Sequence, residues 1–285
     1  MSVLTVPHSR TKIADLMKTI SPSHALGAAL LALVIVGAIY AMEHRIGLEV
    51  ADEGFLWYGA WRTSLGEYPI RDFDSYDPGR YYWAALWLRL FGNDIFVLRL
   101  SGAVIHAAAL IVSLALLRRV TRNPWFLSAA AVVIACWLFP RHKPFEPAIA
   151  IFGSYAATLV VESASPRRLV WAGVFVGAAA SVGRNHGVYL AAAFLALLAW
   201  LRAHHGARTL ARDVISLVAG IVMGYAPMLA LLVFVPGFRH AFTDTFFSFL
   251  RYPAQPPSLW SWSTLSTGGP PVSYTHLTLP TILRV

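Results

Sequence analysis

The sequence is poor in charge and almost free of cysteine. Only 13% of its 285 residues are charged, whereas soluble domains average about 25%. Hydrophobic residues make up 57% of the chain, and its mean hydropathy is +0.59. This composition excludes an ordinary soluble domain. The single cysteine, Cys136, excludes an intramolecular disulfide and a thiolate metal site.

The hydrophobic residues gather in blocks. A membrane-spanning helix needs about 20 mostly apolar residues. Seven blocks reach or approach that length, at residues 24–42, 95–117, 125–139, 148–161, 169–182, 188–201 and 214–235. We therefore predict an all-α polytopic membrane protein with about seven transmembrane helices, in one domain over residues 1–250. The basic N-terminal segment lacks a small-residue cleavage site, so the first block is expected to be a retained helix.

Basic residues sort to one side of this predicted bundle. The loops on the N-terminal side hold Arg10, Lys12, Lys18, Arg118, Arg119, Arg122, Arg167, Arg168, Arg202, Arg208 and Arg212. Because cytoplasmic loops carry an excess of Lys and Arg, the N-terminus is expected inside, in a bacterial inner (plasma) membrane. The net charge of +9 then reflects topology, with membrane lipids as surroundings and no nucleic-acid partner expected.

The first outer loop, residues 52–91, is the most polar long segment between the hydrophobic blocks. It holds six carboxylates and nine tyrosines and tryptophans. Asp52 can cap a short helix over residues 53–65, and Asp77 with Pro78 can start a second one over residues 79–91. Both predicted helices are too short to span, so they are expected to lie in the interface plane.

The layout of this loop resembles one family. An acidic pair, Asp52 and Glu53, follows the first span, and GEYPIRDF at 66–73 and DPGRYYW at 77–83 lead to LFG at 90–92 and LRL at 98–100. These features are similar to those of integral-membrane glycosyltransferases of the GT-C fold, in the branch with protein mannosyltransferases, aminoarabinose transferases and bacterial relatives of families 39 and 83. Many relatives have Lys-Pro-Pro or His-Pro-Pro where this chain has Tyr76, Asp77, Pro78 and Gly79.

The C-terminal part departs from the pattern. The run FRHAFTDTFFSFLRY after residue 237 can form another aromatic interfacial helix, whereas residues 251–285 are irregular. The final PVSYTHLTLPTILRV resembles tails that arise from assembly or reading-frame error, and it is excluded from the fold prediction. Because members of the family are usually longer, the chain is expected to be a C-terminally truncated fragment.

The resemblance implies transfer of a sugar from a polyprenyl-phosphate donor to an acceptor at the outer face, with inversion. Such chemistry needs a carboxylate that accepts the proton of the attacking hydroxyl, and cations that stabilise the leaving phosphate. Asp52 is the expected base, and its alternative interpretation is a helix cap worth about 1 kcal/mol. Glu53 either assists Asp52 or complements the helix dipole.

The donor phosphate is expected to contact basic residues in two outer turns. These are Arg184 and His186 in GRNHG, and Arg141 and Lys143 in RHKPFE. The alternative is that these side chains anchor to lipid headgroups. Positive charge is depleted on the outer side, which favours a functional role for Arg184. Arg99, about one turn inside the second block, can reach the interface.

Asp72, Asp77 and Arg80 are expected to contact substrate from the first outer loop. Asp72, Asp74 and Asp77 together can supply oxygen ligands for a divalent cation, but carboxylates in a turn otherwise cap it or face solvent. A polytopic transporter or lipid flippase without glycosyl transfer is the alternative function. Such proteins show inverted repeats and interrupted spans, and no such repeat is visible in the sequence.

Overall fold

The protein is helical wherever its structure is described. The computed structural model describes residues 22–139, 143–205 and 210–251, and these ranges contain no β-strand. The helices are α2 (Pro22–Glu43), α3 (Glu53–Ser64), α4 (Pro78–Phe91), α5 (Ile95–Leu117), α6 (Pro124–Leu138), α7 (Glu146–Glu162), α8 (Pro166–Val182), α9 (Arg184–His205), α10 (Leu210–Phe234) and α11 (Phe238–Arg251).

Each of the seven hydrophobic blocks corresponds to one helix: the first block to α2, and the other six to α5, α6, α7, α8, α9 and α10 in order. Four of these helices are long and apolar enough to cross a membrane: α2, α5, α9 and α10. α6 is apolar but has only 15 residues, and α7 and α8 have 17 residues each. The described residues therefore support an all-helical membrane protein with four helices suited to span the bilayer.

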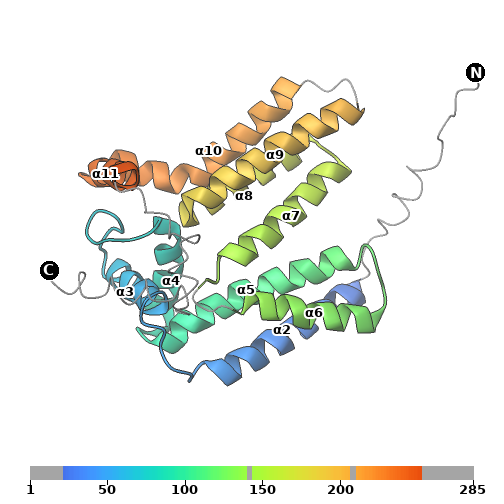
Figure 1. The fold of residues 1–285 in the computed structure, drawn as a ribbon, viewed down its shortest axis with the longest axis horizontal. Coiled ribbons are helices and arrows are strands. Elements are labelled where there is room, and N and C mark those ends of the chain that lie inside the picture. Colours follow the sequence, from blue (N-terminus) through green and yellow to red (C-terminus); the bar gives the residue numbers. More distant parts are fainter. Residues whose placement is uncertain (1–21, 140–142, 206–209, 252–285) are drawn as a thin grey trace, which may run out of the picture.

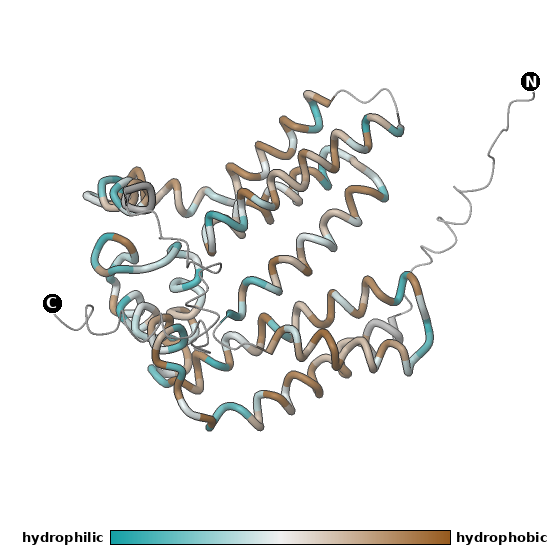
Figure 2. The backbone as a smooth tube through the Cα atoms, in the orientation of Figure 1, coloured by the Kyte–Doolittle hydropathy of each residue, from teal (hydrophilic) through white to brown (hydrophobic). Residues whose placement is uncertain are grey.

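The long helices form two groups with α7 between them (Figure 1). In the first group, α2, α5 and α6 share a core of alanine and leucine that includes Ala109, Leu110 and Ala131. In the second, α8, α9 and α10 pack around Leu169, Val176 and other apolar residues. Brown, hydrophobic stretches follow the long helices, and much of the hydrophilic colour lies at their ends and around α3 and α4 (Figure 2).

The two short helices predicted within residues 52–91 are present as α3 and α4. α3 and α4 pack against each other at one end of the long helices, and the buried Tyr81 of α4 belongs to a core that includes Leu56 of α3 and Leu98 of α5. α4 ends at Gly92, whose φ of 103° is a left-handed conformation that glycine adopts without strain. α11 lies at the same end of the molecule (Figure 1).

α8 and α10 approach each other closely through glycine. Gly173 and Gly177 of α8 face Gly220 and Gly224 of α10, and a Cβ atom on any of the four would clash with backbone of the opposite helix. Small residues at such spacing allow close van der Waals packing, which is a main source of attraction between helices in lipid. The pairing explains how two apolar helices hold a fixed register.

Replacing Gly224 with Ala is therefore expected to force α8 and α10 apart. The added methyl would meet the backbone oxygen of Val174, and overpacking of this kind costs about 1–3 kcal/mol. Thermal unfolding of the purified protein in detergent measures the loss. Gly37→Ala in α2 is the control, because nothing lies within 4 Å of a Cβ there. Equal melting temperatures for the two variants would contradict the close approach.

Candidate functional site

The first turns of four helices meet at one cavity. The cavity has a volume of about 280 Å³. Its lining comes from the start of α3 (Asp52, Phe55, Leu56), from the start of α4 and the loop before it (Tyr76, Asp77, Arg80, Tyr81), from the start of α7 and the segment before it (Lys143, Phe145, Glu146) and from the start of α9 (Asn185, His186). A helix N-terminus carries partial positive charge, so this arrangement favours an anion.

Five residues predicted for the site from separate segments line this single cavity. They are Asp52, Asp77, Arg80, Lys143 and His186. The predicted base therefore shares a chamber with three basic side chains, although more than 130 residues separate the first from the last in sequence. Arg141, also expected at the phosphate, lies outside the described residues.

Arg184 lies beside the cavity and is bound to one of its walls. Its Nε donates to Asp77 Oδ1 at 2.8 Å, and its backbone N–H donates to Asp77 Oδ2 at 2.8 Å. The Arg184 guanidinium also stacks over the ring of Phe242 in α11, with 4.9 Å from Cζ to the ring centroid. The predicted phosphate ligand thus has a protein carboxylate as its partner in this structure.

Asp52 stands at the N-cap position of α3, but its side chain makes no capping hydrogen bond. The cap is supplied by Glu49, whose carboxylate accepts from the backbone N–H groups of Ala51, Asp52 and Glu53 at 3.2, 2.6 and 3.2 Å. The expectation that the Asp52 carboxylate caps this helix is therefore wrong. Glu49 was not among the predicted residues. An acid placed just before a predicted helix start was the available signal.

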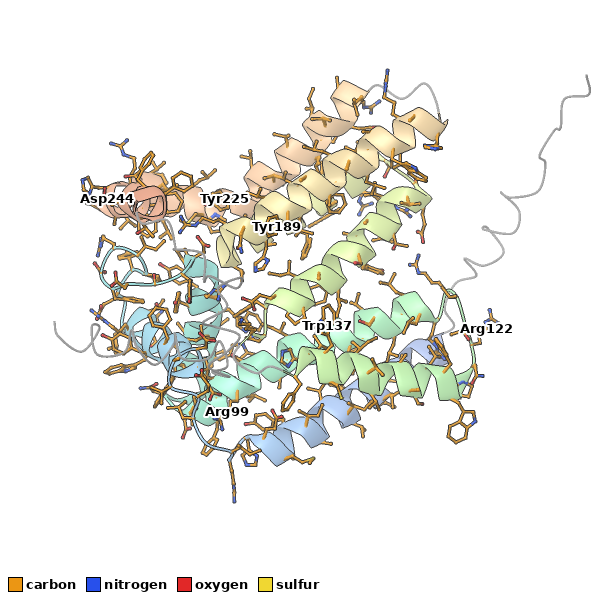
Figure 3. All side chains as sticks on the ribbon, in the orientation of Figure 1. Arg99, Arg122, Trp137, Tyr189, Tyr225 and Asp244 are labelled. Atoms are coloured by element: carbon orange, nitrogen blue, oxygen red, sulfur yellow. The ribbon has the colours of Figure 1, made fainter. Side chains whose placement is uncertain are left out.

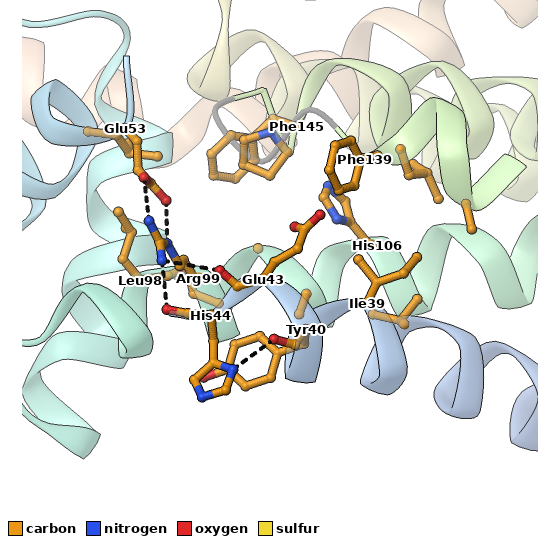
Figure 4. Close-up of a pocket in the computed structure, with 18 residues that line it drawn as sticks. Ile39, Tyr40, Glu43, His44, Glu53, Leu98, Arg99, His106, Phe139 and Phe145 are labelled. Atoms are coloured by element: carbon orange, nitrogen blue, oxygen red, sulfur yellow. Dashed lines mark hydrogen bonds and ion pairs between the residues drawn. The ribbon is translucent and has the colours of Figure 1, made fainter. Parts of the chain in front are cut away.

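Glu53 points away from the cavity into a buried ion pair. Its side chain is 1% exposed, and Arg99 Nε and Nη2 donate to its two carboxylate oxygens at 2.7 and 2.8 Å. Figure 4 shows the pair at one end of a second, smaller cavity of about 50 Å³, which reaches His106 between α2, α5 and α6. This placement favours a positioning role for Glu53 over assistance to Asp52.

Arg99 also forms hydrogen bonds with the segment that connects α2 to α3. Its guanidinium donates to the backbone oxygens of Glu43, His44, Ile46 and Gly47, at distances of 2.6 to 3.3 Å. Arg99 lies at the end of α5 next to α2 and α3 (Figure 3). Its N–H groups thus bind protein, and its location at the membrane interface stays a prediction. An arginine within a span requires such partners.

Of the two alternatives for Asp72, Asp74 and Asp77, the structure favours carboxylates that bind protein or face solvent over a divalent-cation site. Asp72 accepts from the backbone N–H of Tyr68 at 2.8 Å and from Arg71 Nε at 2.7 Å, and this hydrogen bond with Arg71 lowers the pKa of the Asp72 carboxyl. Asp77 is occupied by Arg184, and Asp74 is exposed. Within residues 22–139, 143–205 and 210–251, no group of three or more His, Cys, Asp or Glu side chains could hold a metal ion. Asp72, predicted to contact substrate, stabilises its own turn and does not line the cavity.

Glu146 is a cavity residue that the sequence reading did not select. It occupies the first position of α7, and its Oε1 lies 3.5 Å from Arg80 Nη2. Its Oε2 is buried and has no hydrogen-bond partner among the described residues. A buried carboxylate oxygen without a partner is costly, and a ligand hydroxyl in the cavity would satisfy it. Its position at the end of the basic turn RHKPFE was the available signal.

Aromatic side chains complete the walls. Tyr81 is fully buried, its hydroxyl accepts from the backbone N–H of Tyr76 at 3.1 Å, and burial raises the pKa of that hydroxyl. Phe55 packs edge-on against both Tyr76 and Tyr81. These rings add apolar surface next to the charged groups, and the Arg80 guanidinium lies over the Tyr76 ring, with 5.1 Å from Cζ to the ring centroid, a combination that is common in sites that bind small polar ligands.

Comparison of the chain with protein-family models, with curated proteins and with solved structures finds no match. The case for a function therefore depends on the residues of this cavity and on their chemistry.

Glu53→Gln is expected to destabilise the protein strongly. The substitution removes the carboxylate that pairs with the Arg99 guanidinium, whose side chain is 6% exposed, and breaking a buried pair in this way costs about 3–5 kcal/mol. The free energy of unfolding in detergent tests this. Asp244→Asn is the matched control, because its ion pair with His240 is exposed on α11 and is worth at most about 1 kcal/mol. Equal effects of the two substitutions would contradict a structural role for Glu53.

Proposed function

We propose that the protein is a membrane glycosyltransferase that moves a sugar from a polyprenyl-phosphate donor to an acceptor hydroxyl. The observation that carries this proposal is the convergence of the Asp52 carboxylate with three basic side chains on one cavity, which is built from the first turns of four helices. This reaction requires groups that stabilise the negative charge of the leaving phosphate, and a base that accepts the proton of the nucleophile. Both are supported by residues from four separate segments.

In the proposed reaction, the acceptor oxygen attacks the anomeric carbon of the sugar and forms the new glycosidic bond. The bond from that carbon to the phosphate oxygen breaks, and its electron pair leaves with the polyprenyl phosphate. Asp52 takes the proton of the acceptor hydroxyl. Lys143, Arg80 and His186, with the helix ends behind them, stabilise the charge that grows on the phosphate. Attack opposite to the leaving group inverts the configuration.

The surroundings of Asp52 support this role. Glu49 caps α3 in its place, so the Asp52 carboxylate is not needed for the helix start. The neighbouring Glu53 is fixed to Arg99, which holds the first turn of α3 against α5. A general base must be held in position to be effective, and these two contacts supply that restraint. The lipid flippase alternative would use the same anion site but has no need for a base.

The proposal includes the finer membrane arrangement. All seven helices from α2 and α5 to α10 would cross, in the manner of the N-terminal part of a GT-C enzyme, with α3, α4 and α11 in the outer interface. The exposed aromatic side chains Trp61 and Tyr82 on α3 and α4 suit that layer. The cavity would then open where a lipid-linked donor presents its phosphate, at headgroup level on the outer face.

Asp52→Asn is expected to abolish sugar transfer while leaving donor binding intact. Asn keeps the size of Asp but cannot accept the proton, and loss of a general base costs about a hundred- to ten-thousandfold in rate. Release of polyprenyl phosphate from a polyprenyl-phosphate sugar measures turnover, and equilibrium binding of undecaprenyl phosphate measures affinity. Asp74→Asn is the control, because Asp74 is exposed in the same loop and outside the cavity. Normal turnover of Asp52→Asn would remove Asp52 as the base.

A topology prediction follows from the proposed orientation. A reporter fused after Arg122 should be cytoplasmic, and one fused after Glu67 should lie outside, because the loops with the clustered arginines face the cytoplasm. Alkaline phosphatase and green fluorescent protein fusions report the two sides. A cytoplasmic signal at Glu67 would place the cavity on the inner face and contradict the use of an outer-leaflet donor.

A further inference from the structure

The start of α4 is joined to the turn between α8 and α9 by three adjacent contacts. Arg80 Nε donates to the backbone oxygen of Val182 at 3.0 Å. Gly79 lies directly against Ser181, where an added Cβ would come within 2.6 Å of the backbone oxygen, so only glycine fits without a shift. Asp77 bonds to Arg184 through both carboxylate oxygens. We call this group the DPGR joint, after residues 77–80.

Asp77 caps α9 from a distant part of the chain. Its Oδ2 accepts the backbone N–H of Arg184, the first residue of α9, and its Oδ1 accepts from the Arg184 guanidinium, both at 2.8 Å. The Asp77 side chain is only 10% exposed, so the charge of Arg184 compensates its burial. Neither partner can be removed without leaving the other charge poorly satisfied.

The joint determines where two cavity residues lie. Arg184 immediately precedes Asn185 and His186, whose side chains line the cavity, whereas Arg184 itself is turned toward Asp77 and Phe242. Loss of the joint would release the first turn of α9 and move His186 away from Lys143 and Arg80. The binding site therefore depends on a contact outside it.

We infer that Asp77 and Arg184 are a positioning pair that fixes His186 and Asn185 for a phosphate bound by Lys143, Arg80 and His186. This inference rests on the proposed function, because it names which side chains meet the donor phosphate. It assigns the DPGR segment a structural purpose: to connect the first outer loop to α9. Arg184 then acts on the phosphate through His186.

A double-mutant cycle tests the pair. We would measure the Kd of undecaprenyl phosphate for Asp77→Ala, Arg184→Gln and the double variant of the full chain in detergent. Each single change is expected to weaken binding about tenfold. The Kd of the double variant should not exceed the larger of the two single-variant Kd values, because both changes break the same contact. Glu162→Gln is the control, since Glu162 pairs with Arg119 and Arg168 at the opposite end of α7 and should leave Kd unchanged.

Hydrogen exchange provides a readout that does not depend on any ligand. Amides 184–187 should exchange faster in Asp77→Ala, while those of α2 and α5 keep wild-type protection, which shows that the variant is folded. Asp77→Asn, a milder change that retains an acceptor for the Arg184 N–H, should exchange more slowly than Asp77→Ala.

Two results would overturn the inference. One is unchanged binding and exchange in Asp77→Ala together with weaker binding in Arg184→Gln, which would assign Arg184 to the phosphate directly. The other is multiplication of the two single losses to about a hundredfold in the double variant, which would mean that the residues act independently. If the wild-type chain does not bind undecaprenyl phosphate, the proposed function fails, and the exchange rates alone decide: faster exchange supports the pair and unchanged exchange refutes it.

Discussion

A buried guanidinium in a membrane protein needs protein groups that accept its N–H hydrogen bonds and balance its charge. Arg99 is such a group, and the segments that supply its partners are held close to it. Its partners are the carboxylate of Glu53 and four backbone oxygens from the segment that follows α2. The contacts bring the end of α2, the start of α3 and the start of α5 to one point. Asp52, one residue before Glu53, is thereby held at the mouth of the larger cavity.

The electrostatics of that cavity are closely balanced. Among its lining residues, Asp52, Asp77 and Glu146 oppose Arg80, Lys143 and His186. Asp77 is already neutralised by Arg184, which lies behind the wall, and Glu146 lies near Arg80. The first N–H groups of α3 and α9 already donate to Glu49 and Asp77, so the partial positive charge of helix ends that is left comes from α4 and α7. Lys143 and His186 then remain near Asp52 in the lining, and the proposed donor phosphate would bind beside them.

Helix positions were readable from the sequence because hydrophobic blocks and capping residues are local signals. The helix predicted over residues 79–91 begins at Pro78 and ends at Phe91, since Pro favours the first turn and Gly92 can adopt the left-handed conformation that ends it. The span predicted over residues 188–201 extends to Arg184–His205, because polar residues continue the helix beyond its apolar part. Length and composition support four of the seven predicted crossings.

The sequence predicted several residues that line the cavity, but it did not predict which side chains pair with one another. Asp52, Lys143 and His186 share a cavity, and the predicted topology had put them on one side of the bundle. No local pattern links Glu53 to Arg99 or Asp77 to Arg184, which lie 46 and 107 residues apart. The open alternative of a metal site is not supported, because Asp72 pairs with the adjacent Arg71 and Asp77 pairs with the distant Arg184. Tertiary contacts decide which carboxylates stay available to a ligand.

The most direct measurement is an experimental structure of the protein with undecaprenyl phosphate bound. The account predicts density for the phosphate inside the cavity of about 280 Å³, within hydrogen-bond distance of Lys143 and His186 and adjacent to Asp52. The isoprenoid chain should leave the cavity toward the bilayer. A phosphate located elsewhere on the protein, with the cavity empty of lipid, would contradict the assignment of this chamber as the donor site.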